Sequence, residues 1–309
     1  MSTIVHKDIP YIEGSTDKEQ TLDLYIPQQA FDQERLPPLF VYIHGGCWRS
    51  SDKSEYVYLG TTMAKFGQQA CATGTEKSAT GGLVSICVIN YRLTDRELPP
   101  SFKHPKHWLD CLSSIEFLVQ NGTKYGYDSS RIYLCGHSAG GHLTGLTALD
   151  PPQAWWESLD ADGSDLPISK RIRGVIGLCG IYDHTSLVDR YPDYLEFTEM
   201  TFGTDRTKWN ATAPMHAPFS QADCEVMNSL YPPTFRPHGE MMHHLKYWII
   251  RSTKDELLDH QQSQDYFKHL QELKMENIRL VEEDYGTHFG ALENDTLLKL
   301  FCDFCQADS

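Results

Sequence analysis

The segment Gly136-His-Ser-Ala-Gly140 stands between a strand-like run and a helix-like run, and it constrains the fold more than any other feature. Residues 131–135 have the pattern of a short buried strand, and residues 139–149 carry small and apolar side chains at helical spacing. The two glycines flanking Ser138 remove β-carbons that would clash in a sharp strand-to-helix turn. Such a turn exposes a serine hydroxyl at the carboxyl edge of a parallel sheet, where open α/β folds place their sites.

Strand-like and helix-like segments alternate along the 309 residues, which is typical of a parallel sheet with crossover helices. The sequence therefore predicts a single α/β domain over residues 1–309, with a mostly parallel central sheet and helices on both faces. The predicted strands are 21–26 (an early edge strand), 39–43, 85–89, 131–135, 174–178, 247–250 and 278–281, and the predicted helices are 56–66, 106–119, 139–149, 261–273 and 292–304.

Two segments interrupt this alternation. Residues 68–82 are small, polar and glycine-rich, and we expect a surface loop there. Residues 183–245, which include the stretch 220–243, are rich in Tyr, Pro, Trp and His with weak periodicity. We expect this longer stretch to form a cap over the carboxyl edge of the sheet.

Composition narrows the classes of partner. The formal net charge is −15 and no dense Lys/Arg cluster occurs, which argues against nucleic-acid binding. No run approaches the ~18 apolar residues of a membrane span, and no basic segment followed by an apolar one opens the chain. The nine cysteines are odd in number and several fall in predicted strands, so we expect buried reduced thiols and a cytoplasmic protein.

A nucleophilic serine needs a base and a carboxylate that orients the base. In strand–turn–helix folds of this kind the carboxylate and then the histidine follow the serine along the chain. Asp255 follows the strand at 247–250 in a polar turn, with Glu256 and Asp259 as alternatives, and His288 follows the last strand in a glycine-bounded loop. We therefore predict Ser138, Asp255 and His288 as a catalytic triad.

The loop after the strand at 39–43 is His44-Gly45-Gly46-Cys47-Trp48. Paired glycines let backbone N–H groups face a cavity without interference from side chains. We predict that the amides of Gly46 and Cys47, together with that of Ala139, form an oxyanion hole. Cys47 acts through its backbone in this interpretation.

Three weaker patterns suggest other chemistry. Cys302-x-x-Cys305 has redox or metal spacing but lies on a predicted helix, and Ser50-x-x-Lys53 has the spacing of a serine–lysine pair. His137 and His142 flank Ser138 in the turn at residues 136–140, called the elbow below. No carboxylate or thiol nearby in the sequence completes a metal-ligand set with them. We predict neither a metal nor a cofactor.

His44-Gly-Gly-Cys-Trp48 resembles the HGGxW signature of the kynurenine formamidases of the α/β-hydrolase superfamily. Residues 90–93, 180–183 and 191–194 are similar to segments of the fungal members. The resemblance implies an α/β-hydrolase fold and cleavage of N-formyl-L-kynurenine to L-kynurenine and formate in tryptophan breakdown toward NAD. It also implies a cofactor-free enzyme that often forms homodimers.

A formyl group is small, so specificity must come from the aromatic leaving side, which favours aromatic walls. The candidate substrate contacts are Trp48, Tyr182 and Phe289, followed by Tyr191, Tyr194, Trp155 and Trp156. Two other functions use the same fold: a general carboxylesterase of small acyl esters, and a catalytically silent hydrolase fold that serves as a binding module.

Overall fold

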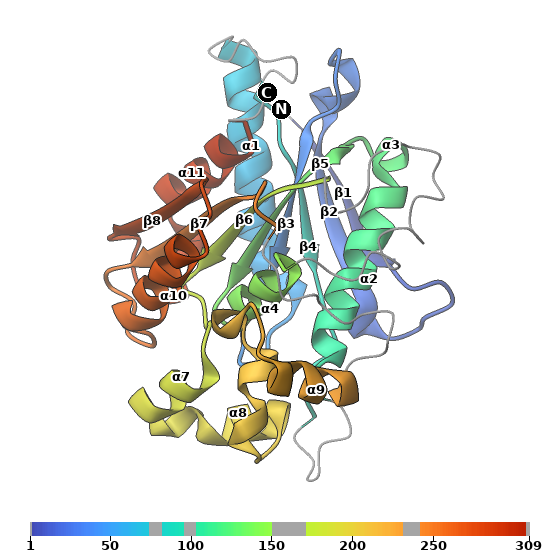
Figure 1. Cartoon of the computed structure of the whole chain (residues 1–309). Coiled ribbons are helices and arrows are strands. Elements are labelled where there is room, and N and C mark those ends of the chain that lie inside the picture. Colours follow the sequence, from blue (N-terminus) through green and yellow to red (C-terminus); the bar gives the residue numbers. More distant parts are fainter. Residues whose placement is uncertain (1, 74–81, 96–102, 150–170, 231–241, 307–309) are drawn as a thin grey trace.

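Eight strands form one twisted sheet at the centre of the molecule (Figure 1). The computed structural model describes residues 2–73, 82–95, 103–149, 171–230 and 242–306. The sheet order is β1-β2-β4-β3-β5-β6-β7-β8, in which β1–β2 and β2–β4 are antiparallel and the remaining pairs are parallel. The strands are β1 Thr3–Pro10, β2 Thr21–Pro27, β3 Pro38–Ile43, β4 Ser85–Ile89, β5 Asp128–His137, β6 Ile172–Leu178, β7 Lys246–Ser252 and β8 Ile278–Glu283.

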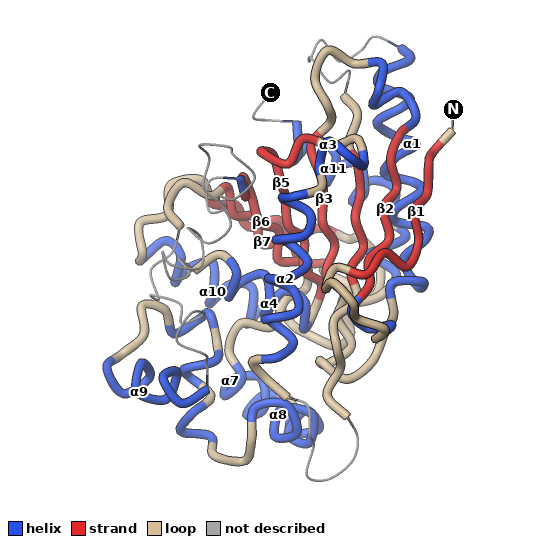
Figure 2. Tube along the Cα trace, turned by 90° about the vertical axis from the view of Figure 1, so that its right-hand side faces the viewer, coloured by secondary structure: helices blue, strands red, loops and turns tan. Residues whose placement is uncertain are grey.

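Helices cover both faces of this sheet, as Figure 2 shows from the side. Helices α1 and α11 pack on one face, where Phe40 of β3 stacks on Phe301 at a ring separation of 5.3 Å. Helices α2, α4 and α10 pack on the other face. The bounds are α1 Val57–Thr73, α2 Lys106–Gln120, α3 Gly122–Tyr125, α4 Ala139–Thr147, α10 His260–Glu272 and α11 Asp295–Gln306.

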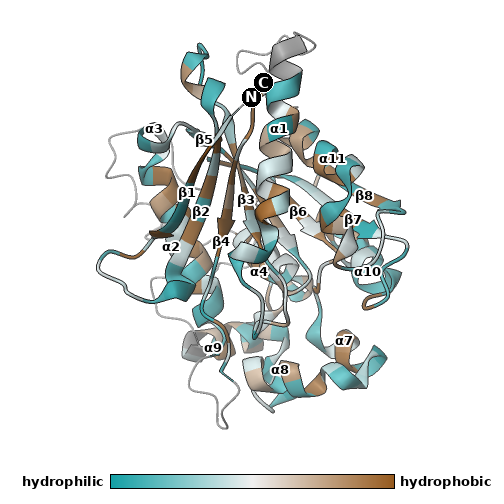
Figure 3. Cartoon of the chain, turned by 180° about the vertical axis from the view of Figure 1, so that it is seen from behind, coloured by the Kyte–Doolittle hydropathy of each residue, from teal (hydrophilic) through white to brown (hydrophobic). Residues whose placement is uncertain are grey.

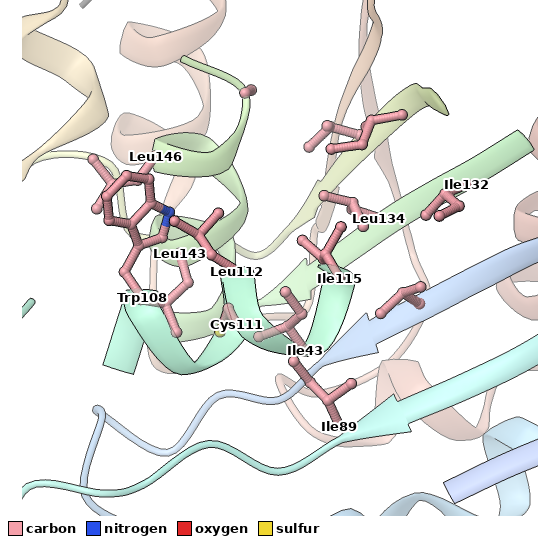
Figure 4. Close-up of a cluster of buried hydrophobic side chains, with 14 of the residues drawn as sticks. Ile43, Ile89, Trp108, Cys111, Leu112, Ile115, Ile132, Leu134, Leu143 and Leu146 are labelled. Carbon is pink, nitrogen blue, oxygen red and sulfur yellow. The ribbon is translucent and has the colours of Figure 1, made fainter. Parts of the chain in front are cut away.

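The apolar pattern of the sequence explains this layering. Strands β3 and β4 are buried along their whole length, as expected of parallel strands covered on both faces. Figure 4 shows Trp108, Leu112 and Ile115 of α2 against Leu134 and Ile43 of the sheet. Figure 3 shows the same division, with brown central strands and teal stretches on the outer helices. Burial of both sheet faces supplies the main stabilisation.

A group of short helices lies beyond the carboxyl ends of the strands (Figure 1). These helices are α7 His184–Arg190, α8 Leu195–Phe202 and α9 Gln221–Leu230, joined by 3₁₀ turns that include Arg206–Lys208, Asn210–Thr212 and Pro214–His216. They come from the stretch for which the sequence predicts a cap. The weak periodicity of that stretch reflects many short turns, each with its own start and stop.

The predicted strands and helices match the structure closely, and two expectations need correction. The segment 21–26 is not at the edge, because β1 pairs antiparallel outside β2. Helix α1 continues to Thr73, so residues 68–73 are not loop. The Gln68 side chain is buried and donates to the carbonyl of Ser2 at 2.9 Å, which ties this part of the helix to the sheet edge.

The rest of the predicted loop at 74–82 falls mostly outside the described residues, as do Trp155, Trp156 and part of the 220–243 segment. Within the part of the chain that the structure describes, no helix combines the length and the apolar character that a bilayer crossing requires.

Candidate active site

Ser138 occupies the turn between β5 and α4, at the carboxyl edge of the sheet. Its backbone adopts φ 55° and ψ −118°, a conformation that non-glycine residues seldom occupy. The Ser138 amide donates to the carbonyl of Leu178 at 2.9 Å, and its carbonyl accepts from Gly141 at 2.9 Å and Ile181 at 3.2 Å. The surrounding backbone therefore holds the strained turn in place.

The two glycines of the motif permit close backbone approaches. A β-carbon on Gly136 would lie 2.0 Å from the carbonyl oxygen of Gly140. A β-carbon on Gly140 would lie 2.1 Å from the carbonyl oxygen of Ile43. Both contacts are with backbone atoms that cannot move aside, so only glycine fits at either position.

Asp255 and His288 meet at this same edge, after β7 and β8 respectively. Asp255 Oδ2 lies 2.8 Å from His288 Nδ1, and both side chains are almost completely buried. Burial by itself would raise the pKa of Asp255, but the hydrogen bond and charge of His288 and the amides of Leu257 and Leu258 hold that pKa below its ordinary value. An ionised carboxylate only accepts, so Nδ1 carries the proton and Nε2 keeps its lone pair.

The loop that carries His288 is fixed beside the elbow. The His288 amide donates to Glu256 at 2.9 Å, and its carbonyl accepts from Nε2 of His137 at 3.0 Å. The rings of His137 and His288 pack with centroids 4.4 Å apart. Because His137 immediately precedes Ser138, the imidazole of His288 lies next to the elbow.

The two alternative carboxylates have other partners. Glu256 holds the backbone of His288 rather than its ring. Asp259 caps α10 by accepting from the amide of Gln261 at 3.0 Å, and it pairs with Arg190 at 2.6 Å. Among these three acidic residues, Asp255 is the one that contacts the imidazole.

The glycine loop after β3 runs directly against the elbow. A β-carbon on Gly45 would lie 2.8 Å from Cβ of Ser138. Gly46, Cys47 and Trp48 have φ values of 91°, 52° and 59°, so the chain makes a run of left-handed residues. Tyr91 donates to the carbonyls of His44 and Gly45 at 3.0 and 3.1 Å, which holds the start of this loop in place.

Three backbone amides near Ser138 have no acceptor among the residues that the structure describes. They belong to Gly46, Cys47 and Ala139, the three donors predicted from the sequence. Amides without an acceptor in the protein are able to donate to an anion. Burial raises the pKa of the Cys47 thiol to about 11, so its side chain stays neutral beside these amides.

Trp48 and Tyr182 are fully buried, so the contact of their rings with a substrate stays a prediction. The Trp48 indole donates to Nδ1 of His142 at 3.2 Å, and His142 Nε2 donates to the carbonyl of Thr212 at 2.6 Å. Tyr182 stacks on Tyr266 at 4.2 Å. Trp48 therefore ties the glycine loop to the helices beyond the sheet, and Tyr182 belongs to the core.

Phe289 differs, since 53% of the residue is exposed. Its ring lies nearly perpendicular to that of His288, with the two ring centroids 5.1 Å apart. It is the one aromatic candidate from the first group of three that has surface to offer a ligand beside the imidazole. Tyr191 has a different contact: its hydroxyl accepts a hydrogen bond from the amide of Asp259 at 2.8 Å.

The weaker patterns do not form sites. Ser50 Oγ donates to the carbonyl of Gly46 at 2.9 Å, and Lys53 Nζ pairs with Asp23 at 2.8 Å, so these two side chains serve different contacts. Cys302 and Cys305 are buried in α11, where the Cys302 thiol donates to the carbonyl of Met63.

Three possible metal-ligand atoms gather at the site. The ligand atoms of Cys179, Asp255 and His288 all lie within 4.8 Å of one another. However, the 2.8 Å between Asp255 and His288 is a hydrogen-bond length, and two ligands of one tetrahedral Zn²⁺ at ~2.0 Å would stand ~3.3 Å apart. The pair fits a shared proton better than a shared metal ion.

Two residues near the site were not predicted from the sequence as candidates: Cys179, which directly follows β6, and Arg49, which follows the glycine loop. Cys179 has a positive φ of 45°, a feature that the sequence does not reveal. Its place at the end of a parallel strand was a signal, because residues there face the same edge as the elbow.

Residues 22–270 match the family model described as BD-FAE. The chain belongs to the BD-FAE family. Two curated relatives are kynurenine formamidases of yeasts: that of Meyerozyma guilliermondii is 29% identical over 72% of this chain and 68% of its own, and that of Scheffersomyces stipitis is 27% identical over 76% and 79%.

Among solved structures, esterase B from Lactobacillus rhamnosis (HN001) superposes with a TM-score of 0.62 at 19% identity, covering 98% of this chain and 86% of that one. This likeness shows the fold. The predicted α/β-hydrolase fold and the resemblance to kynurenine formamidases are both confirmed.

Three buried histidines, His44, His107 and His142, should make the folded protein less stable in acid. Burial lowers the pKa of His44 and His142 to about 4 and that of His107 to about 3. An unfolded chain takes up protons at these residues near pH 6.5, whereas the folded chain does not, so stability is lost as the pH falls from 6.5 toward 4. Each histidine is expected to contribute about 2 kcal/mol of this loss between pH 7 and 5.

Urea unfolding at pH 7, 6 and 5 measures this loss. The variant His142→Gln should show a shallower pH dependence than the parent, whereas substitution of the exposed His260 should leave the slope unchanged. Equal slopes for the parent and His142→Gln would contradict the assignment of His142 as a buried neutral histidine.

Proposed function

We propose that this chain is a serine hydrolase that cleaves the formamide of N-formyl-L-kynurenine to give L-kynurenine and formate. The observation that carries the proposal is the 2.8 Å contact between buried Asp255 and His288, beside a strained serine turn. The yeast relatives named kynurenine formamidase support the choice of substrate. In this role the protein acts in tryptophan breakdown toward NAD.

In the proposed mechanism, Ser138 attacks the formyl carbon while His288 Nε2 takes the hydroxyl proton. Asp255 holds the Nδ1 proton and stabilises the imidazolium that forms. His288 then protonates the departing aryl amine, which leaves a formyl ester on Ser138. Water attacks this ester with His288 again as the base, and formate is released.

The oxyanion that forms during each attack needs donors that are already in position. We assign this role to the amides of Gly46, Cys47 and Ala139, which have no acceptor within the described part of the chain. Each such donor contributes about 10²–10³ in rate. Because they belong to the backbone, no side-chain rearrangement is required during the reaction.

We further propose that the chain is one domain in which residues 183–245 act as a cap over the site. Helices α7 and α8 lie beyond the carboxyl ends of the strands (Figure 1). Trp48 and His142 link this region to the glycine loop. A cytoplasmic location and a homodimer stay predictions that rest on the resemblance to kynurenine formamidases.

The proposed substrate carries a carboxylate, and we propose that Arg49 binds it. Arg49 follows the proposed oxyanion donor Cys47 by two residues, and its guanidinium lies 3.7 Å from the ring centroid of Phe197 in α8. Its carboxylate partner, Glu196, is 3.5 Å away with 73% of its side chain exposed. A pair of this kind is weak, so a substrate carboxylate can replace Glu196.

A general carboxylesterase is the second candidate, because solved structures with this fold include esterases. It would use the same serine, histidine and oxyanion loop. The two functions differ in the group that leaves, so the ratio of kcat/KM for N-formylkynurenine to that for p-nitrophenyl acetate separates them.

For the triad, we predict that Ser138→Ala and His288→Ala lower kcat on N-formylkynurenine by about 10⁴-fold or more. Asp255→Asn is expected to lower it by about 10³–10⁴-fold, because the imidazole then loses its oriented tautomer. Glu256→Gln, the matched control on the neighbouring residue, should cost less than about tenfold, since it holds only the backbone of His288.

Steady-state assays with both substrates check this prediction. A kcat/KM ratio that strongly favours the ester in the parent protein would reject the formamidase in favour of the esterase. Near-full activity in Asp255→Asn together with a large loss in Glu256→Gln would show that the orienting carboxylate has been misassigned.

For recognition, Arg49→Gln should raise KM for N-formylkynurenine by about 10- to 100-fold, because a charged hydrogen bond is lost. The same variant should leave kcat/KM for neutral p-nitrophenyl acetate within about threefold of the parent. Glu196→Gln, which removes the competing carboxylate, should not raise KM for N-formylkynurenine. An equal effect of Arg49→Gln on both substrates would contradict a role in binding the carboxylate.

A further inference from the structure

Cys179 lies at the first position beyond β6 and faces the proposed triad. It is buried, its φ is 45°, and its amide donates to the carbonyl of Ile250 in β7 at 2.8 Å. The Cys179 backbone is therefore held by its direct connection to β6 and by this hydrogen bond to β7. A non-glycine residue keeps a left-handed conformation only where its surroundings over-determine it, and such positions cluster at functional sites.

The Cys179 side chain reaches the catalytic pair. Its Sγ, a carboxylate oxygen of Asp255 and a ring nitrogen of His288 lie within 4.8 Å of one another. Burial, followed by the charge of Asp255, raises the pKa of the Cys179 thiol well above its usual range. The group is therefore a neutral S–H that can donate to the carboxylate and cannot serve as a nucleophile.

The environment of Asp255 leaves room for one more donor. An ionised carboxylate has about four acceptor positions. Oδ1 accepts from the amides of Leu257 and Leu258 at 2.9 and 3.0 Å, and Oδ2 accepts from His288 at 2.8 Å. Because the Asp255 side chain is fully buried, water does not reach the remaining position. Cys179 is the polar side chain beside it.

We propose that Cys179 is a positioning residue for the catalytic pair, whose S–H group holds the Asp255 carboxylate in line with His288 and moderates its attraction for the imidazole proton. The inference rests on the proposed triad and goes beyond it by adding a fourth side chain. A residue that only fills space would be replaceable by any small side chain. A donor, by contrast, is replaceable only by another donor.

The variants that separate these two roles are Cys179→Ala and Cys179→Ser. Alanine removes the donor, whereas serine restores one of smaller size. Cys87→Ala is the matched control, because Cys87 is a fully buried thiol in β4 away from the site. Turnover of p-nitrophenyl acetate as a function of pH supplies a readout that does not depend on formamidase specificity.

We expect Cys179→Ala to lower kcat/KM by about tenfold, the effect of losing a hydrogen bond to a charged group. Without the S–H donor, Asp255 attracts the imidazole proton more strongly, so the acidic limb of the pH–rate profile should move to higher pH. Cys179→Ser should recover most of the activity and the position of that limb. In an Asp255→Asn background, Cys179→Ala should have little further effect.

A second readout works even without turnover. The proton on Nδ1 of His288, shared with Asp255, gives a strongly downfield proton NMR signal, which Cys179→Ala should move further downfield and Cys87→Ala should not. An unchanged signal and an unchanged acidic limb in Cys179→Ala would overturn the proposal. Absence of Ser138-dependent turnover in the parent would count against the proposed function, while the NMR comparison would still decide the role of Cys179.

Discussion

The hydrogen bond between Asp255 and His288 is the interaction on which the rest of the site depends. The two residues follow neighbouring parallel strands, β7 and β8, so the register of the sheet brings their loops together. At 2.8 Å and with both side chains buried, the pair fixes which imidazole nitrogen keeps its lone pair. Without that choice of tautomer, the strained serine turn nearby would present an ordinary alcohol, which is a poor nucleophile at neutral pH.

A second network holds the glycine loop, to which we assign the oxyanion donors. Tyr91 donates to the carbonyls of His44 and Gly45. Trp48 donates to His142, which in turn donates to the carbonyl of Thr212. These contacts fix the glycine loop between the sheet and the helices beyond it. Aromatic and histidine side chains serve here because they combine apolar bulk with a directed donor or acceptor. Both networks lie beside Ser138, and in the proposed mechanism one prepares the nucleophile and the other stabilises the negative charge that develops.

Much of this architecture could be predicted from the sequence, and the misses have physical causes. Buried parallel strands such as β3 and β4 are continuous apolar runs. The glycines around Ser138 are required because a β-carbon at Gly136 or Gly140 would lie 2.0 or 2.1 Å from a carbonyl oxygen, so both features leave clear patterns. Strand β1 is half-exposed at the sheet edge and lacks such a run. The burial of Trp48 and the approach of Cys179 to Asp255 depend on tertiary packing, which no local pattern encodes.

The central claim is that distant residues convert one particular alcohol, that of Ser138, into a nucleophile. Reaction with an organophosphonate, followed by mass spectrometry of the digested protein, tests this most directly. The account predicts a single adduct on Ser138 that forms rapidly in the parent and about 10³-fold more slowly when His288 is replaced by alanine. An adduct on another residue, or labelling of Ser138 at the same rate without His288, would contradict it.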